Sequence, residues 1–209
     1  MLNTAPDAAA MRDQTLKRLA DFIFELGMLR KTPRTGYQFL GSGAENVAEH
    51  SFRTAMIGYI LARRTGADVA KTVFLCLFHD VHEARIGDFN YVNRIYNTCN
   101  PALALTHALE GTGLRSEVLE LWHELEAGET MEARLAEDAD QLDFIANLKE
   151  EADLGNPYAG KWLAHAILRL KTDAARELAV AVQSTDQSDW WFVRPEESWW
   201  RKGNGKIRT

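Results

Sequence analysis

Two adjacent residues, His79 and Asp80, close an apolar run of the sequence. A neutral imidazole nitrogen and an ionised carboxylate oxygen both suit a divalent cation, so this doublet can supply half of a metal site. The other half has to come from elsewhere in the chain. The candidates are His50, in the segment Glu45 to Ser51, and Asp140, in an acidic run.

The spacing of these four residues fits side chains that converge from three helices. The stretch between His50 and His79 is long enough for one helix, a short turn and an antiparallel return, so the start of one helix can face the end of the next. Asp140 would come from within a third helix. Helical bundles build metal sites from facing helices in this way. If the metal is octahedral, two nitrogens and two oxygens also leave coordination positions open for water and substrate.

The apolar residues recur with helical periodicity along almost the whole chain, which predicts an all-α fold. A first helix carries Leu16 to Leu26 as a core-facing stripe. Asn46 can cap a helix over about residues 47–65, with Phe52, Met56 and Ile60 facing inward. A helix from about Asp68 ends at the doublet. Loops are expected over residues 30–45 and 88–100, and further helices over about residues 102–109, 116–126, 132–151, 157–170 and 172–182.

The size and charge of the chain exclude several classes of protein. Its 209 residues are 46% hydrophobic, enough for one sizeable core. The net charge of −6 and the scattered basic residues argue against a nucleic-acid polymer as partner. No stretch approaches the roughly 18 apolar residues of a membrane span, and no targeting segment is evident, so a cytoplasmic protein is expected. Only Cys76 and Cys99 are present, too few for a disulfide framework.

The predicted organisation is an N-terminal extension over residues 1–11, one helical domain over 12–185 and a tail over 186–209. The tail holds Trp190, Trp191, Trp199 and Trp200. Because so many indole rings are costly to leave in water, the tail is expected to pack on the body or on a partner subunit.

The motifs resemble those of the HD-domain metal-dependent phosphohydrolases, in which a His, then His-Asp, then Asp recur in order. Within that superfamily the segments Glu45 to Ser51 and His79 to Asp88 are most similar to the bacterial 5'-deoxynucleotidases and their eukaryotic HD-domain relatives. The third segment, Ala139 to Leu142, also fits. The resemblance covers roughly Leu16 to Asn156 and implies a single-domain helical HD bundle.

The resemblance also implies an activity: hydrolysis of a 5'-(deoxy)nucleoside monophosphate to nucleoside and phosphate through a metal-activated water. The divalent metal, whether Mn, Co, Ni, Fe, Zn or Mg, would be held by His50, His79, Asp80 and Asp140. Glu83 and Asp88 would line the reaction centre as acid-base groups, with Asp88 alternatively holding a sugar hydroxyl. A basic residue in the preceding loop would bind the phosphate. The candidates there are Arg30, Lys31 and Arg34, and a homodimer is expected.

Three alternatives stay open at this point. The same fold could act on another phosphate ester, such as a nucleoside triphosphate or a signalling nucleotide. A second metal bound through His82 would suit a di-iron oxygenase. The chain could also be a metal-stabilised binding module that uses the Trp-rich tail as its interaction surface. His107, His123 and His165 lie outside the motifs and are interpreted as surface residues.

Overall fold

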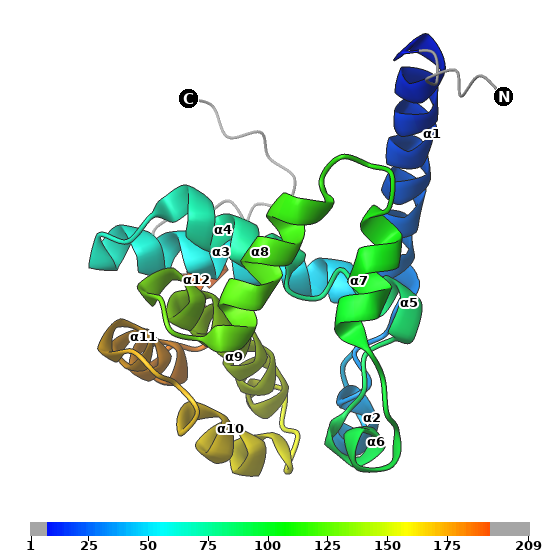
Figure 1. Ribbon diagram of the computed structural model, residues 1–209. Helices are drawn as coiled ribbons and strands as arrows, with labels where there is room; N and C mark the ends of the chain where they lie inside the picture. The colour runs from blue at the N-terminus through cyan, green and yellow to red at the C-terminus, as the bar shows by residue number, and fades with distance from the viewer. Residues whose placement is uncertain (1–7, 193–209) are drawn as a thin grey trace, which may run out of the picture.

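The computed structural model describes residues 8–192 and shows helices packed around one long central helix, α9 (Figure 1). No β-strand occurs within these residues, so the predicted all-α fold is confirmed. The elements are α1 Ala8–Leu26, the 3-10 helix η1 Gly27–Lys31, α2 Tyr37–Leu40, α3 Val47–Thr65, α4 Val69–Phe78, α5 Glu83–Ile86, α6 Tyr91–Tyr96, α7 Pro101–Leu109, α8 Arg115–Ala127, α9 Met131–Asp153, α10 Ala159–Ile167, α11 Asp173–Ser184 and α12 Asp189–Phe192.

Helix α3 begins and ends where the sequence predicts. The Asn46 side chain accepts a hydrogen bond from the Glu49 backbone amide, and the Glu49 side chain accepts one from the Asn46 amide, which forms a capping box. Gly66 ends the helix in a left-handed conformation with φ 78°. The expected inward face is wrong: Phe52, Met56 and Ile60 are exposed.

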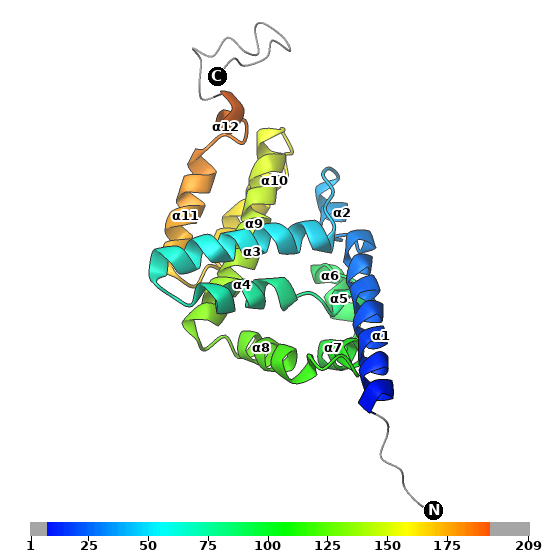
Figure 2. The same ribbon diagram turned by 90° about the horizontal axis from the view of Figure 1, so that it is seen from above.

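The buried face of α3 is built instead from mostly small or polar side chains, namely Val47, His50, Ser51, Thr54, Ala55, Gly58, Leu61 and Ala62. Small residues occupy this face because α4 and α9 both pack directly against it, as Figure 2 shows. At Gly58 the approach is closest, since a Cβ there would lie 2.5 Å from the Sγ of buried Cys76 on α4.

Helix α4 is capped by the Asp68 side chain, which accepts from the Lys71 amide, and it ends with His79 as its C-cap residue. The predicted position of the His-Asp doublet, at the end of a helix, is therefore confirmed. The helix does not continue through Glu83. A turn intervenes, and the short α5 restarts at Glu83 before Gly87, with φ 78°, ends it.

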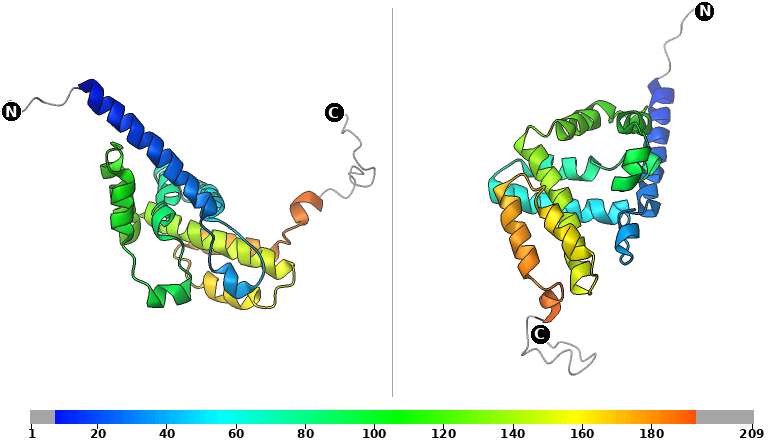
Figure 3. Two further views of the ribbon diagram at one scale, coloured as in Figure 1. Left: turned by 90° about the vertical axis from the view of Figure 1, so that its right-hand side faces the viewer. Right: turned by 90° about the horizontal axis from the view of Figure 1, so that it is seen from below.

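Helix α1 ends at the predicted place, but its stripe is only partly buried. Phe22 packs in a small second core with Val81, Leu105 and Val118, whereas Leu16 and Ile23 are exposed. The reason is visible in Figure 3, where the N-terminal half of α1 extends away from the body. Most of its contacts are with α7 and η1, and Glu25 near its end pairs with Arg85 on α5.

The remaining predicted helices are found, with α10 shorter than expected and bounded by turns. The two predicted loops contain short elements that the sequence pattern did not reveal: the end of η1 and all of α2 in residues 30–45, and α6 in residues 88–100. Asp138, buried on α9, accepts hydrogen bonds from the Lys171 and Thr172 amides and from the Thr172 hydroxyl, which fixes the start of α11 against α9.

The predicted domain limits are not tested by these elements, although α1 starts at Ala8, inside the expected extension. In the tail, Trp190 is exposed and stacks edge-on against Trp191, while Trp199 and Trp200 lie outside the described residues. Among the described helices, none is both long and apolar enough to cross a membrane.

Candidate metal centre

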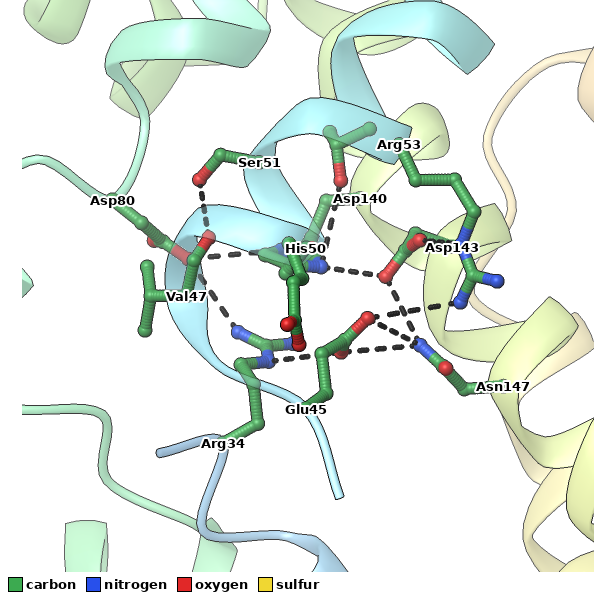
Figure 4. A network of polar contacts seen from close by, with 12 residues as sticks. Arg34, Glu45, Val47, His50, Ser51, Arg53, Asp80, Asp140, Asp143 and Asn147 are labelled. Carbon is green, nitrogen blue, oxygen red and sulfur yellow. Dashed lines mark hydrogen bonds and ion pairs between the residues drawn. The ribbon is translucent and has the colours of Figure 1, made fainter. Parts of the chain in front are cut away.

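His50 is fully buried in the first turn of α3 and presents both ring nitrogens to acidic partners. Its Nδ1 lies 2.6 Å from the Oδ2 of Asp143, so the Nδ1–H donates to that carboxylate. The Nε2 is then the nitrogen that carries the lone pair, and it points toward the end of α4 and toward Asp140 (Figure 4). A hydrogen bond of this kind fixes the tautomer that a metal requires.

A hydrogen bond from Nδ1–H also orients His79, which faces His50 from the end of α4. Its Nδ1 lies 2.6 Å from the backbone carbonyl oxygen of Cys76, to which it donates. Its Nε2 faces the Nε2 of His50 at 3.1 Å. Two imidazoles whose Nδ1–H groups are both used thus direct their Nε2 lone pairs at the same point.

The two predicted carboxylates complete the cluster. Asp140 Oδ1 lies 3.1 Å from His50 Nε2, and Asp80 Oδ2 lies 3.0 Å from His79 Nε2 and 3.7 Å from His50 Nε2. The structure therefore brings all four predicted ligands together from α3, the end of α4 and α9. We call His50, His79, Asp80 and Asp140 the His/Asp cluster.

The donor set of this cluster fits a divalent cation. Four lone-pair-bearing atoms facing one another repel unless a positive charge lies between them, and two imidazole nitrogens with two carboxylate oxygens are a common ligand set for divalent transition metals. The alternative positive charge is a proton. Although burial opposes it, hydrogen bonds to Asp140 and Asp143 raise the pKa of His50 to about 10.

The neighbouring groups respond to the same electrostatics. Burial opposes charge at His79 and at both carboxylates, but the Asp80 carboxylate raises the pKa of His79, and His79 lowers that of Asp80. The hydrogen bond with His50 lowers the pKa of Asp140. A cation bound here competes with protons on the two histidines, so its affinity rises with pH.

Behind His50 lies a partly buried polar network that sequence reasoning missed. The Arg53 guanidinium donates to Asp143 and, at 2.7 Å, to Glu150. The Asn147 amide donates to Asp143 at 3.2 Å and to both oxygens of Glu45 at 3.1 Å. Glu45, His50 and Asp143 also bring ligand atoms together, but hydrogen bonds from Arg53, Asn147 and His50 already take up the Asp143 carboxylate.

One signal in the sequence could have found Asp143. It follows Asp140 by one helical turn, so both point from the same side of α9, and a metal-binding histidine usually needs a carboxylate or carbonyl partner for its second nitrogen. Because Asp143 follows an acidic run around Asp140, the sequence pattern instead favours interpreting it as a solvated surface residue.

Glu83 and Asp88, the predicted acid-base residues, are both buried close to the His/Asp cluster. Burial, and then the charges of Asp80 and Asp88, raise the pKa of Glu83 to about 9. Asp88 Oδ2 accepts from the Thr35 amide at 2.8 Å, and the Thr35 hydroxyl donates to the Asp88 carbonyl oxygen at 3.1 Å. Thr35 thereby ties the loop after η1 to the loop after α5.

Only one of the three predicted phosphate-binding residues reaches the cluster. The Arg34 Nη1 lies 3.4 Å from Asp80 Oδ2, and its Nε lies 3.9 Å from Glu45 Oε2. Arg30 and Lys31, at the end of η1, are exposed and border neither of the cavities described next.

Two cavities meet at the His/Asp cluster and share Asp80, Phe89, Arg94 and Asp140. Cavity 1, of about 200 Å³, is bordered by Arg34 and by aromatic rings that include Tyr37, Tyr91, Phe144 and Trp162. Cavity 2, of about 530 Å³, is bordered by His79, His82, Glu83 and the segment 97–99. His82 lies with Asp80 and Glu83 on this side, and burial lowers its pKa.

The chain belongs to the HD-domain family: the profile of the HD domain matches residues 26–181. Among its relatives is a zebrafish (Danio rerio) protein named 5'-deoxynucleotidase HDDC2, 26% identical over 194 residues that cover 83% of this chain and 96% of the relative. The human (Homo sapiens) protein of that name is 29% identical over 145 residues, covering 66% of this chain and 70% of the relative.

A solved structure shows the same fold. The conserved hypothetical protein from Pyrococcus furiosus superimposes with a TM-score of 0.67 at 28% identity, covering 79% of this chain and 99% of that one. The resemblance inferred from the motifs is thus confirmed at the level of the family.

Proposed function

We propose that this protein is a metal-dependent phosphohydrolase that converts 5'-(deoxy)nucleoside monophosphates to nucleoside and phosphate. The observation that carries the proposal is the convergence of His50, His79, Asp80 and Asp140 beside two cavities. The names of the zebrafish and human relatives support the substrate class.

In this proposal His50, His79, Asp80 and Asp140 hold a divalent cation, which when bound acidifies water and neutralises charge on the phosphoryl oxygens. Glu83 moves a proton. Because burial beside Asp80 and Asp88 raises its pKa to about 9, Glu83 is protonated at neutral pH and can donate to the leaving 5' oxygen. Its Oε2 is buried without a hydrogen-bond partner among the described residues, so it is available for that role.

Asp88 and Arg34 orient the substrate. The Thr35 amide fixes one oxygen of Asp88, which leaves the other oxygen to accept from a sugar hydroxyl. Arg34, beside Asp80, supplies positive charge close to where the phosphoryl oxygens would lie. Arg30 and Lys31 stay predictions that would require their exposed side chains to move into the site.

Cavity 1 suits the nucleoside part of the substrate. Aromatic side chains are the usual partners of a nucleobase, because every base presents a face for stacking. Phe144 and Trp162 lie with ring centroids 6.2 Å apart, and both border the cavity.

The test is phosphate release by metal-loaded protein from a panel of nucleoside mono- and triphosphates. We expect release from the monophosphates, loss of activity in His79→Ala and Asp80→Ala, and full activity in His165→Ala, an exposed histidine that lines neither cavity. If only nucleoside triphosphates reacted, with release of pyrophosphate or triphosphate, the proposal would be wrong and the protein would be a nucleoside triphosphate hydrolase of the same fold. If His79→Ala and Asp80→Ala both kept full activity, the His/Asp cluster would not be the active site under any of the candidate functions.

Metal analysis identifies the ion. The His/Asp cluster accommodates Mn, Co, Ni, Fe, Zn or Mg, and we propose one cation per chain at that site. Two irons per chain would point to the oxygenase alternative, with His82 and Glu83, which lie beside Asp80, as the additional ligands.

We further propose a cytoplasmic homodimer. Ile23 and Phe24 on α1 and Phe52 on α3 are exposed by 67%, 79% and 68%, which is costly in water and favours a partner. Sedimentation equilibrium should give twice the chain mass of 23.6 kDa, and cell fractionation should place the protein with soluble enzymes. A monomeric mass at micromolar concentration would contradict the dimer.

A further inference from the structure

The His/Asp cluster is surrounded by more negative than positive charge. Besides Asp80 and Asp140, it has the carboxylates of Asp88, Glu45 and Asp143 close by. The two arginines within this shell are already engaged: Arg34 with Asp80 and Glu45, and Arg53 with Asp143, Glu150 and Glu45. A phosphate dianion entering the site therefore needs a cation that no carboxylate already neutralises.

Arg94, on α6, meets this requirement. It borders both cavities, along with Asp80 and Asp140, the two carboxylates that the cavities share. Within residues 8–192 its guanidinium makes no ion pair or hydrogen bond. A guanidinium presents five donors in a planar fork that matches phosphate oxygens.

The short helix α6 is held in a fixed position relative to Arg34. The Asn90 side chain caps α6 by accepting from the amides of Val92 and Asn93 at 3.1 and 2.9 Å. The Asn90 amide donates to the Thr35 hydroxyl at 2.9 Å, directly beside Arg34 in the chain. Tyr91 and Arg94, three residues apart, both line cavity 1 from α6.

A second arginine at the same cavity is a weaker candidate. Arg169 lies over the Tyr91 ring, 4.7 Å from its centroid, and donates to the Tyr91 hydroxyl. It borders cavity 1 alone, whereas His79 and Glu83 border cavity 2, and Tyr91 already engages it.

From these contacts we infer that Arg94 binds the substrate phosphate, as the counterpart to Arg34 at the His/Asp cluster. The inference rests on the proposed function for its substrate class and extends it by naming a residue that the motifs do not include. A phosphate between Asp80, Asp140 and Arg94 would lie at the junction of the two cavities, with the nucleoside in cavity 1.

The test is equilibrium dialysis of radiolabelled inorganic phosphate against Mn²⁺-loaded protein. We expect Arg94→Ala to weaken phosphate binding by about tenfold to a hundredfold, because one charge-assisted contact is lost. Arg94→Lys should recover part of the loss, because it restores the charge without the planar fork. Arg63→Ala, the matched control at an exposed arginine of α3 that borders neither cavity, should bind as the wild type does. Wild-type phosphate binding by Arg94→Ala would overturn the inference.

Three further readouts separate the possible causes. In the enzyme assay Arg94→Ala should raise KM for the monophosphate while leaving inhibition by the free nucleoside unchanged. If Arg94→Ala lost affinity for nucleoside and for phosphate to the same extent, Arg94 would merely support α6, and the inference would fail. Mn²⁺ affinity should not change. If the wild type binds phosphate through Arg94 yet hydrolyses no monophosphate, the proposed function fails while the phosphate site stands.

Discussion

At the scale of single residues, the imidazole of His50 depends on Asp143 for its protonation state. Because Asp143 accepts a hydrogen bond from Nδ1–H, the Nε2 lone pair faces His79, Asp80 and Asp140. Asp143 is itself held by Arg53 and Asn147, so it cannot turn away. It is a positioning residue whose effect should appear in metal affinity.

We therefore expect Asp143→Asn to weaken metal binding by about 10- to 100-fold, since a neutral amide no longer fixes the His50 tautomer. Competition with a chromophoric chelator measures this affinity. The control is Asp138→Asn on the same helix, a buried carboxylate that caps α11. It should lower the free energy of unfolding by about 1–3 kcal/mol and leave metal affinity unchanged. Equal affinities for Asp143→Asn and the wild type would speak against the positioning role.

Glu83 predicts a pH dependence of stability in metal-free protein. Its pKa is raised to about 9 in the folded state from 4.5, so the folded protein holds a proton that the unfolded chain releases. The cost of ionising the buried group is absent below pH 4.5 and grows as pH rises toward 9. Relative to wild type, Glu83→Gln should thus gain stability with rising pH, by at least about 1 kcal/mol between pH 5 and pH 9.

Urea unfolding of both proteins at pH 5, 7 and 9 measures this difference. Asp21→Asn, a change of an exposed carboxylate on α1, is the matched control and should show no such trend. A stability difference between Glu83→Gln and wild type that stays flat with pH would refute the raised pKa.

The sequence predicted the four cluster residues because their types and order are informative on their own. It missed Asp143 because an aspartate in an acidic run resembles a solvated surface residue. It missed Arg94 because the segment from Asp88 to Asn100 shows no period, and nothing local reveals that α6 borders a cavity. Such roles depend on contacts between residues far apart in the chain.

At the scale of elements, the site depends on how closely α3 approaches α4. Gly58 permits this approach, since any Cβ would meet Cys76, whose carbonyl oxygen orients His79. Helix ends were predictable from Asn46, Asp68 and the glycines that follow, because caps are local. The buried face of α3 was not predictable, because close packing of α4 and α9 against it, rather than hydrophobicity alone, decides which residues turn inward.

Gly58→Ala should consequently lower the free energy of unfolding by about 1–3 kcal/mol through overpacking. It should also weaken metal binding, since α3 and α4 carry His50 and His79. Gly160→Ala on α10 is the control, because a Cβ there meets nothing within 4 Å. It should be neutral or stabilise by about 0.5–1 kcal/mol. Chemical denaturation measures both variants, and equal stability for the two would disprove the packing argument.

At the scale of the whole molecule, a cation in the His/Asp cluster would link α3, the end of α4 and α9. Binding to the folded state alone stabilises it by mass action, by about 2.7 kcal/mol at a metal concentration 100 times Kd. For a chain of this size the melting temperature should rise by several degrees when metal replaces chelator.

Differential scanning calorimetry with Mn²⁺ and with chelator tests this stabilisation. His79→Ala should lose the metal-dependent rise, and His165→Ala should keep it. A rise of the same size in His79→Ala would place the cation elsewhere.

The all-α class and the order of the helices followed from periodicity and caps, but the position of the cavities did not, because it depends on how α6, α9 and α10 meet. Asp140 comes from α9, far along the chain from His50 and His79. During synthesis both histidines therefore leave the ribosome well before the last ligand. A nascent chain that has made only α1 to α8 has an incomplete site, so full metal loading must wait for the translation and docking of α9.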